Sequence, residues 1–100
     1  MYTIEYLPIA KSDMVDIAKY IGVKLENPEA AERLAEKMIE AAEKLTDMPY
    51  KCPVHIPVKP LRHEYRKLIV QNYIMFYWVD EDKKLITIAR VVYSGSCLLY

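Results

Sequence analysis

The segment from Tyr65 to Asp80 constrains the fold of this chain more than any other. It consists of two runs rich in β-branched and aromatic residues, separated by Gln71 and Asn72. Apolar runs joined by two residues predict a β-hairpin, and Asn72 tolerates the positive φ angle that a tight hairpin turn needs. A further strand is predicted from Leu85 to Tyr93. We therefore expect the C-terminal half to form consecutive antiparallel strands.

The N-terminal half has the pattern of one short strand followed by two helices. Residues 2–6 alternate between apolar and polar, and Pro8 suits the first turn of a helix because its missing N–H is not needed there. Gly22 predicts that this first helix frays toward its end. The apolar stripe expected on its buried face comprises Met14, Ile17, Ala18, Ile21 and Leu25.

The second helix has a clear start signal at residues 27–29. Asn27 offers a capping side chain, Pro28 fits the first helical position, and Glu29 places an acid near the positive end of the helix dipole. The helix is predicted to end near Asp47. The resulting order is β-α-α-β-β-β, which indicates a single α+β domain spanning residues 1–100. Its helical hairpin is expected to pack on one face of a mainly antiparallel sheet.

The predicted core joins the helical stripes to the strands. Its members are Met14, Ile17, Ile21, Leu34, Met38, Leu45, Leu68, Val70, Phe76 and Ile88. The middle strand, residues 73–80, is apolar on both faces, and one layer of helices covers only one of them. The other face is predicted to be a partner surface, or to be closed by the proline-rich segment 48–60 and the C-terminus.

The charge of the chain is balanced overall but unevenly distributed. Residues 1–50 carry ten acidic and six basic side chains, whereas residues 51–100 carry four acidic and eight basic ones. The basic excess lies in residues 51–67 and consists of Lys51, Lys59, Arg62, Arg66 and Lys67, opposed only by Glu64. Such a surface suits an acidic partner or a phosphate backbone. The alternative is an ordinary solvated loop.

The remaining composition excludes several classes of protein. Cys52 and Cys97 have neither the spacing nor the neighbouring histidines of a zinc site, so free thiols and no metal or cofactor are expected. No apolar run is long enough to span a membrane and no secretory signal opens the chain, which makes the cytoplasm the expected location.

The strand pattern resembles one family of proteins. The sequence reads Arg-x-Leu-x-Val-x-Asn-Tyr-x-x-Phe-Tyr-x-Val-Asp from Arg66, and a later strand ends Arg-Val-x-Tyr at Tyr93. This pattern resembles the RelE/ParE toxins of bacterial type II toxin–antitoxin pairs, from Met1 to about Tyr93. The resemblance implies a cognate antitoxin that blocks the toxin by covering apolar surface. It implies one of two targets: DNA gyrase for ParE-like toxins, or ribosome-bound mRNA for RelE-like ones.

The resemblance also supplies candidate residues. If the protein cleaves RNA, the candidates for holding phosphate or moving a proton are His63, Arg66, Arg90 and Tyr93. For each arginine the alternative is a pairing with a nearby carboxylate, and for each of the other two it is a surface or packing role. Candidates for binding the target or the antitoxin are Ile9, Tyr20, Val23, Lys59, Arg62 and Lys67. The basic residues 59–67 are expected to meet acidic residues of the antitoxin.

The charge and the candidate residues favour one target, and the C-terminus bears on whether the chain is active at all. The net charge is zero and no convincing acid–base set is visible, which favours a ParE-like gyrase inhibitor over a RelE-like endoribonuclease. Family members commonly continue after the last strand with a basic tail, but here residues 94–100 carry no basic side chain. We therefore expect the natural chain to be longer, with a non-native end here. An inactive module that only binds an antitoxin is the third possibility.

Overall fold

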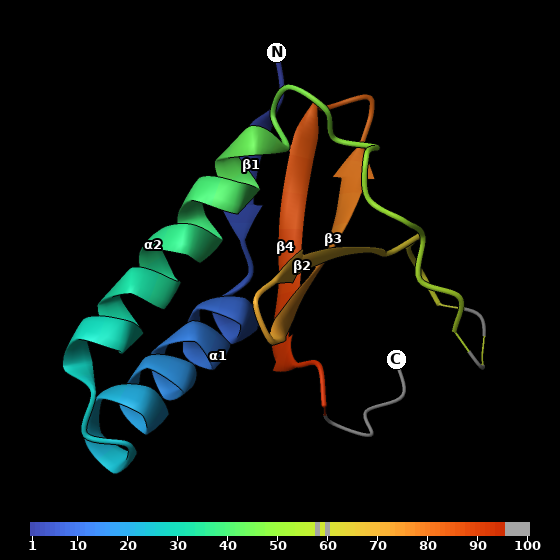
Figure 1. Cartoon of the computed structure of the whole chain (residues 1–100). Helices are drawn as coiled ribbons and strands as arrows, with labels where there is room; N and C mark the ends of the chain where they lie inside the picture. Colours follow the sequence, from blue (N-terminus) through green and yellow to red (C-terminus); the bar gives the residue numbers. More distant parts are fainter. Residues whose placement is uncertain (58, 60, 96–100) are drawn as a thin grey trace.

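The elements of this computed structural model follow the predicted order, and the model describes residues 1–57, 59 and 61–95 (Figure 1). Their bounds are β1 (Thr3–Tyr6), α1 (Pro8–Lys19), the π-helical turn η1 (Tyr20–Lys24), α2 (Pro28–Lys44), β2 (Arg66–Val70), β3 (Tyr73–Asp80) and β4 (Leu85–Tyr93). The predicted α+β class is confirmed. The expectation of a non-native C-terminus concerns residues 96–100, which lie outside the described part of the chain.

The four strands form one mixed sheet in the order β1-β4-β3-β2. β1 runs parallel to β4, whereas β2 pairs with β3 and β3 with β4 in antiparallel fashion. The hairpin turn lies at Gln71 and Asn72 as predicted, but the residue with positive φ is Gln71, at 55°, and not Asn72. Gln71 is exposed, so its side chain meets no packing constraint in this left-handed conformation.

The helices lie together on one side of the sheet and bury its central strands (Figure 1). Tyr77, Met75, Ile86 and Ile88 are completely buried there. Six of the predicted core residues belong to this cluster: Leu34, Met38, Leu45, Leu68, Val70 and Ile88. Three more, Met14, Ile17 and Ile21, are partly buried against it. The prediction was wrong for Phe76, which is buried outside this cluster because alternate residues of β3 point to opposite faces.

The helix ends follow their sequence signals with two differences, of which the first is that α2 ends at Lys44 and not near Asp47. The Asn27 side chain accepts a hydrogen bond from the N–H of Ala30 at 3.2 Å, which confirms the predicted cap. The end of the first helix is not frayed but widened into η1, where the N–H of Leu25 donates to the carbonyl of Tyr20. This wider turn moves Leu25 off the buried stripe, and the residue is 55% exposed.

The second face of the sheet is closed in part by the proline-rich segment. We call residues Pro49–Pro57 the strap. It follows α2, bridges to the edge strand β2 through Val54 and Arg66, and places the ring of His55 at 5.2 Å from that of Phe76. Phe76 is only 6% exposed. Of the two coverings predicted for this face, the strap thus provides one. Within the described residues, no helix combines the length and hydrophobicity needed to cross a membrane.

Candidate functional site

A groove of about 840 Å³ opens between the helices and the far end of the sheet. Its apolar lining comes from α1, η1, α2, β3 and β4 and comprises Ile17, Tyr20, Ile21, Leu25, Ala30, Leu34, Tyr73, Val91 and Tyr93. Its polar lining comprises Asp13, Asp16, Asn27, Gln71 and Asn72. The charged side chains in the lining are both acidic. Because Asp13 is paired with Arg90, the exposed Asp16 carries the uncompensated acidic charge of a largely apolar lining.

Asp13 lines the groove and links α1 to β4 through hydrogen bonds. Its carboxylate accepts hydrogen bonds from Nε of Arg90 at 2.8 Å and from a terminal nitrogen of the same guanidinium at 3.1 Å. It also accepts from the backbone N–H of Val91 at 3.0 Å. Sequence reasoning missed Asp13. The available signal was an acid within the buried stripe of α1, one turn after Ala10 and one turn before Ile17.

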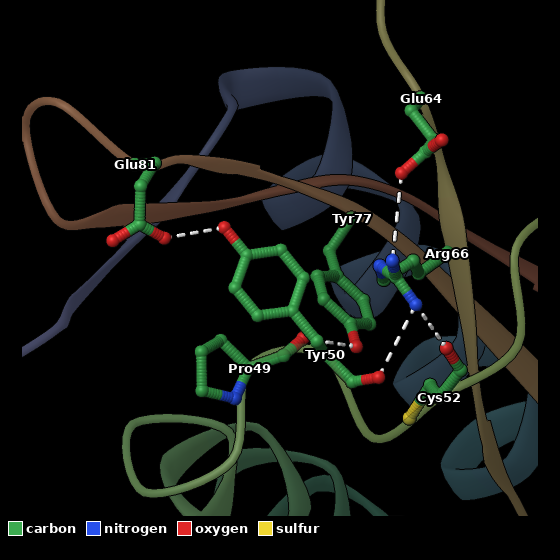
Figure 2. Close-up of polar contacts among 7 residues, drawn as sticks. All are labelled: Pro49, Tyr50, Cys52, Glu64, Arg66, Tyr77 and Glu81. Carbon is green, nitrogen blue, oxygen red and sulfur yellow. Dashed lines mark hydrogen bonds and ion pairs between the residues drawn. The ribbon is translucent and has the colours of Figure 1, made fainter.

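A second polar cluster holds the strap against β2 and β3 (Figure 2). Arg66 donates to the carbonyl oxygens of Cys52 at 2.7 Å and Tyr50 at 3.2 Å, and pairs with Glu64 at 3.4 Å. The buried hydroxyl of Tyr77 donates to the carbonyl of Pro49 at 2.8 Å. Burial raises the pKa of the Tyr77 phenol, because the phenolate is poorly solvated inside the fold. The hydroxyl therefore remains a donor.

The β3–β4 turn adds a third polar cluster around Glu81. Lys84, Tyr50 and Tyr2 all donate to its carboxylate, with the Tyr50 bond at 2.5 Å and the closer Tyr2 bond at 2.7 Å. These hydrogen bonds, that from Lys84 first, hold the pKa of Glu81 down at about 2. The same carboxylate raises the pKa of Tyr50 to about 12. The cluster ties β1, the strap and the turn together.

Aromatic contacts cover the face of the sheet away from the helices. The ring of His63 stacks on Trp78 with centroids 3.8 Å apart and planes 2° from parallel. Tyr65 meets the same indole edge-on at 5.6 Å. His63 and Tyr65 belong to the segment that leads back from the strap into β2. We call residues 61–65 the return arm.

The four candidates for RNA cleavage do not form one group: His63 and Arg66 lie in or against the return arm, whereas Arg90 binds a residue of the groove lining and Tyr93 belongs to that lining. His63 is stacked on Trp78, and Arg66 is bonded to the strap. Arg90 is paired with Asp13, and Tyr93 lines the groove and is 53% exposed. Arg66 pairs across the sheet with Tyr77 and Arg90 with Phe76, and the β3–β4 register shifts between Phe76 and Tyr77.

The candidates for partner binding divide between the two sides of the molecule. Tyr20 lines the groove, while Ile9 and Val23 lie exposed on α1 and η1. The basic candidates lie in or next to the return arm: Lys59 and Arg62 are exposed and Lys67, in β2, is half-buried. Among the described residues, no group of three or more His, Cys, Asp or Glu side chains is placed to hold a metal ion.

A comparison with models of protein families identifies one family. Residues 4–95 match the family model described as the ParE toxin of the type II toxin–antitoxin system parDE. A comparison with curated protein sequences gives no significant match. The fold is similar to that of a chain in the chromosomal ParDE toxin–antitoxin system of P. aeruginosa, with a TM-score of 0.72 and 19% identity, covering 93% of this chain and 96% of that one.

Two further solved structures share the fold at lower similarity. One is the RelE–RelB complex of Pyrococcus horikoshii, with a TM-score of 0.63, 16% identity, and 96% and 98% of the two chains covered. The other is a RelBE toxin–antitoxin complex from Mycobacterium tuberculosis, with a TM-score of 0.59, 21% identity, and 92% and 96% covered. The fold is therefore RelE/ParE-like. Since the family model spans nearly the whole chain, the protein belongs to the ParE toxin family of type II toxin–antitoxin systems.

Proposed function

We propose that this ParE toxin inhibits DNA gyrase by binding it and is neutralised by a cognate antitoxin. The gyrase target is the one that the resemblance to ParE toxins implies. The observation that carries this choice is the commitment of both candidate arginines to internal partners. Arg66 has a side chain only 16% exposed and is bonded to two strap carbonyls, and Arg90 is bonded to Asp13. Cleavage of RNA requires phosphate-binding and proton-transfer groups gathered at one place.

The groove is the place we assign to the antitoxin. Toxins of similar fold have been solved in toxin–antitoxin complexes. An amphipathic segment could bury apolar side chains against Tyr20, Tyr73 and Tyr93, and a basic side chain could approach Asp16. Ile9 and Val23 would extend this contact along the helices.

The basic residues belong to a different surface, which we assign to the target. Lys59 and Arg62 lie on the segment that leads into β2 and Lys67 lies in β2, whereas the groove lining carries the exposed Asp16. The sequence-based expectation that these basic residues meet the antitoxin is therefore revised in this proposal. A basic surface accelerates association with an acidic partner, and the gyrase–DNA complex presents one.

A supercoiling assay with purified gyrase tests the proposal. The toxin should inhibit gyrase, and an equimolar amount of the cognate antitoxin should restore supercoiling. In cells, expression should induce the DNA-damage response and leave ribosome-bound mRNA uncut. Cuts mapped to the ribosomal A site, with gyrase unaffected, would instead establish the endoribonuclease. An antitoxin that binds tightly to a toxin without effect in either assay would identify an inactive binding module.

A further inference from the structure

The strap presents a physical problem that its sequence creates. Pro49, Pro53 and Pro57 have no backbone N–H, so this segment donates few hydrogen bonds to a neighbouring strand. It must be held mainly through its carbonyl oxygens. Those oxygens need donors from the sheet, and an edge strand alone offers one backbone N–H for every two residues.

The sheet supplies these donors in a row. The carbonyl of Pro49 accepts from the Tyr77 hydroxyl, and the carbonyl of Pro53 accepts from the backbone N–H of Lys67 at 3.0 Å. Between them, the carbonyls of Tyr50 and Cys52 both accept from one terminal nitrogen of Arg66. Side chains of the sheet thus donate to the strap and compensate for the hydrogen bonds that its prolines cannot donate (Figure 2).

Arg66 also reaches the other end of the loop. Its second terminal nitrogen pairs with Glu64 in the return arm, and its guanidinium lies 5.1 Å from the ring centroid of Tyr50. One planar, forked cation therefore joins the start of the strap, the return arm and the edge strand. Lysine has a single ammonium and lacks this fork, so it cannot make the same set of contacts.

We propose that Arg66 is a positioning residue of the toxin, which acts on the target through the strap and return arm and does not touch the target. By holding both ends of this loop, it fixes Arg62 and the exposed Lys51, which lies between Tyr50 and Cys52 and which we add here to the basic surface of Lys59, Arg62 and Lys67. The inference rests on the proposed function, since it takes the basic surface as the contact with gyrase. It assigns the guanidinium to shaping that surface.

The only tryptophan of the chain reports directly on this arrangement. Trp78 lies beneath His63 of the return arm, so loosening the loop should admit a soluble quencher to the indole. The backbone bonds from His55 to Tyr65 and from Lys67 to Pro53 provide a second report through amide hydrogen exchange. Both signals report on whether the strap and return arm are held in place, and neither reports on the groove.

The experiment compares the full chain with Arg66→Gln, Arg66→Lys and the matched control Arg33→Gln, which alters an exposed arginine on α2. In Arg66→Gln, amide exchange at His55 and Lys67 should accelerate by about tenfold or more, as expected for losing charge-assisted hydrogen bonds. Acrylamide quenching of Trp78 should increase. The toxin concentration that half-inhibits gyrase should rise by about tenfold or more, because the basic surface is no longer fixed.

Arg66→Lys should fall between wild type and Arg66→Gln in all three measurements. Antitoxin affinity should stay unchanged in every variant, which also shows that each one is folded. If Arg66→Gln fails to fold, Glu64→Gln releases only the return arm and should give the same pattern more weakly. Neutralising Lys51 and Arg62 should weaken gyrase inhibition without changing the quenching of Trp78.

The opposite results are equally defined. Loss of gyrase inhibition with unchanged exchange and quenching would show that Arg66 touches the target, and the proposal would be wrong. A loosened loop with full inhibition would also overturn it, because the loop would then not present the contact. If wild type never inhibits gyrase while Arg66→Gln still loosens the loop, the proposed function fails but the role of Arg66 in holding the loop stands.

Discussion

A single carboxylate, that of Asp13, serves both a side chain and the edge of the sheet. β1 pairs with β4 only as far as Ile88, and beyond that point Asp13 accepts the N–H of Val91. The same carboxylate neutralises Arg90, so a buried donor and a half-buried cation share one acceptor. A group in this position carries more stability than an exposed ion pair.

Asp13→Asn should therefore destabilise the fold by about 2 kcal/mol, since an amide cannot accept two guanidinium bonds and the Val91 N–H as a carboxylate does. Urea denaturation gives the free energy of unfolding. The control is Asp16→Asn, one turn further along α1, where the side chain is exposed. Equal stabilities for the two variants would contradict the role given to Asp13.

Glu81 makes the stability of the fold depend on pH. Its folded pKa of about 2 lies below the ordinary value of 4.5, so its carboxylate stabilises the fold fully above pH 4.5 and progressively less as the pH falls toward 2. The difference in free energy of unfolding between wild type and Glu81→Gln should shrink over that range. Because the cluster is exposed, the difference should also shrink in about 1 M salt. A difference that stays constant down to pH 2, measured beside the control Asp82→Asn, would refute this.

Each element of this fold depends on another for its stability. α2 has a good cap, but its buried residues, among them Leu34 and Met38, are what fasten it to the sheet. The strap likewise depends on donors from β2 and β3. Helices of this length gain most of their stability from such packing.

Leu34→Ala should cost roughly 2–5 kcal/mol, because the side chain is 5% exposed within the core and its removal leaves a cavity. The matched control is Ile39→Ala on the same helix, where the side chain is 49% exposed and a smaller loss is expected. Chemical denaturation of both variants gives the comparison. A loss below about 1 kcal/mol for Leu34→Ala would mean that the helix does not pack as described.

At the scale of the whole molecule, the acidic and basic candidates for binding lie on different surfaces. The groove lining carries the exposed Asp16 beside an Asp13 that is paired with Arg90, whereas Lys59, Arg62 and Lys67 lie in or next to the return arm. This separation would allow antitoxin and target to be recognised on different surfaces. On separate surfaces, the antitoxin would block gyrase binding by changing the conformation of the toxin and not by covering the same residues.

Binding of the cognate antitoxin should slow amide exchange at Tyr20 to Val23 and at Tyr73, and should leave the amide of Lys67 unchanged. It should also raise the melting temperature, because a ligand that binds only the folded state stabilises it by mass action. Tyr20→Glu should weaken antitoxin binding, and the exposed Val15→Glu provides a control outside the groove lining. Slower exchange confined to the strap and return arm would contradict our assignment of the antitoxin to the groove.

The sequence by itself determined the elements and their order. The cap at Asn27, the two-residue turn at Gln71 and Asn72, and the alternation of β3 are local signals, and each depends on residues close together in the chain. The six predicted residues of the core follow from the same periodicities. Membership of the toxin family could also be read from the strand pattern.

Only the tertiary structure decided which polar groups meet. Asp13 and Arg90 are separated by 77 residues, and Tyr2 and Glu81 by 79, so no local pattern predicts either contact. The same holds for the strap, whose prolines indicate a stiff connection but not which face it covers. Pairings of this kind arise when helices and strands distant in sequence pack and bring their remaining donors and acceptors together. Such polar groups must then be satisfied inside the fold, which is why the candidate arginines are committed there.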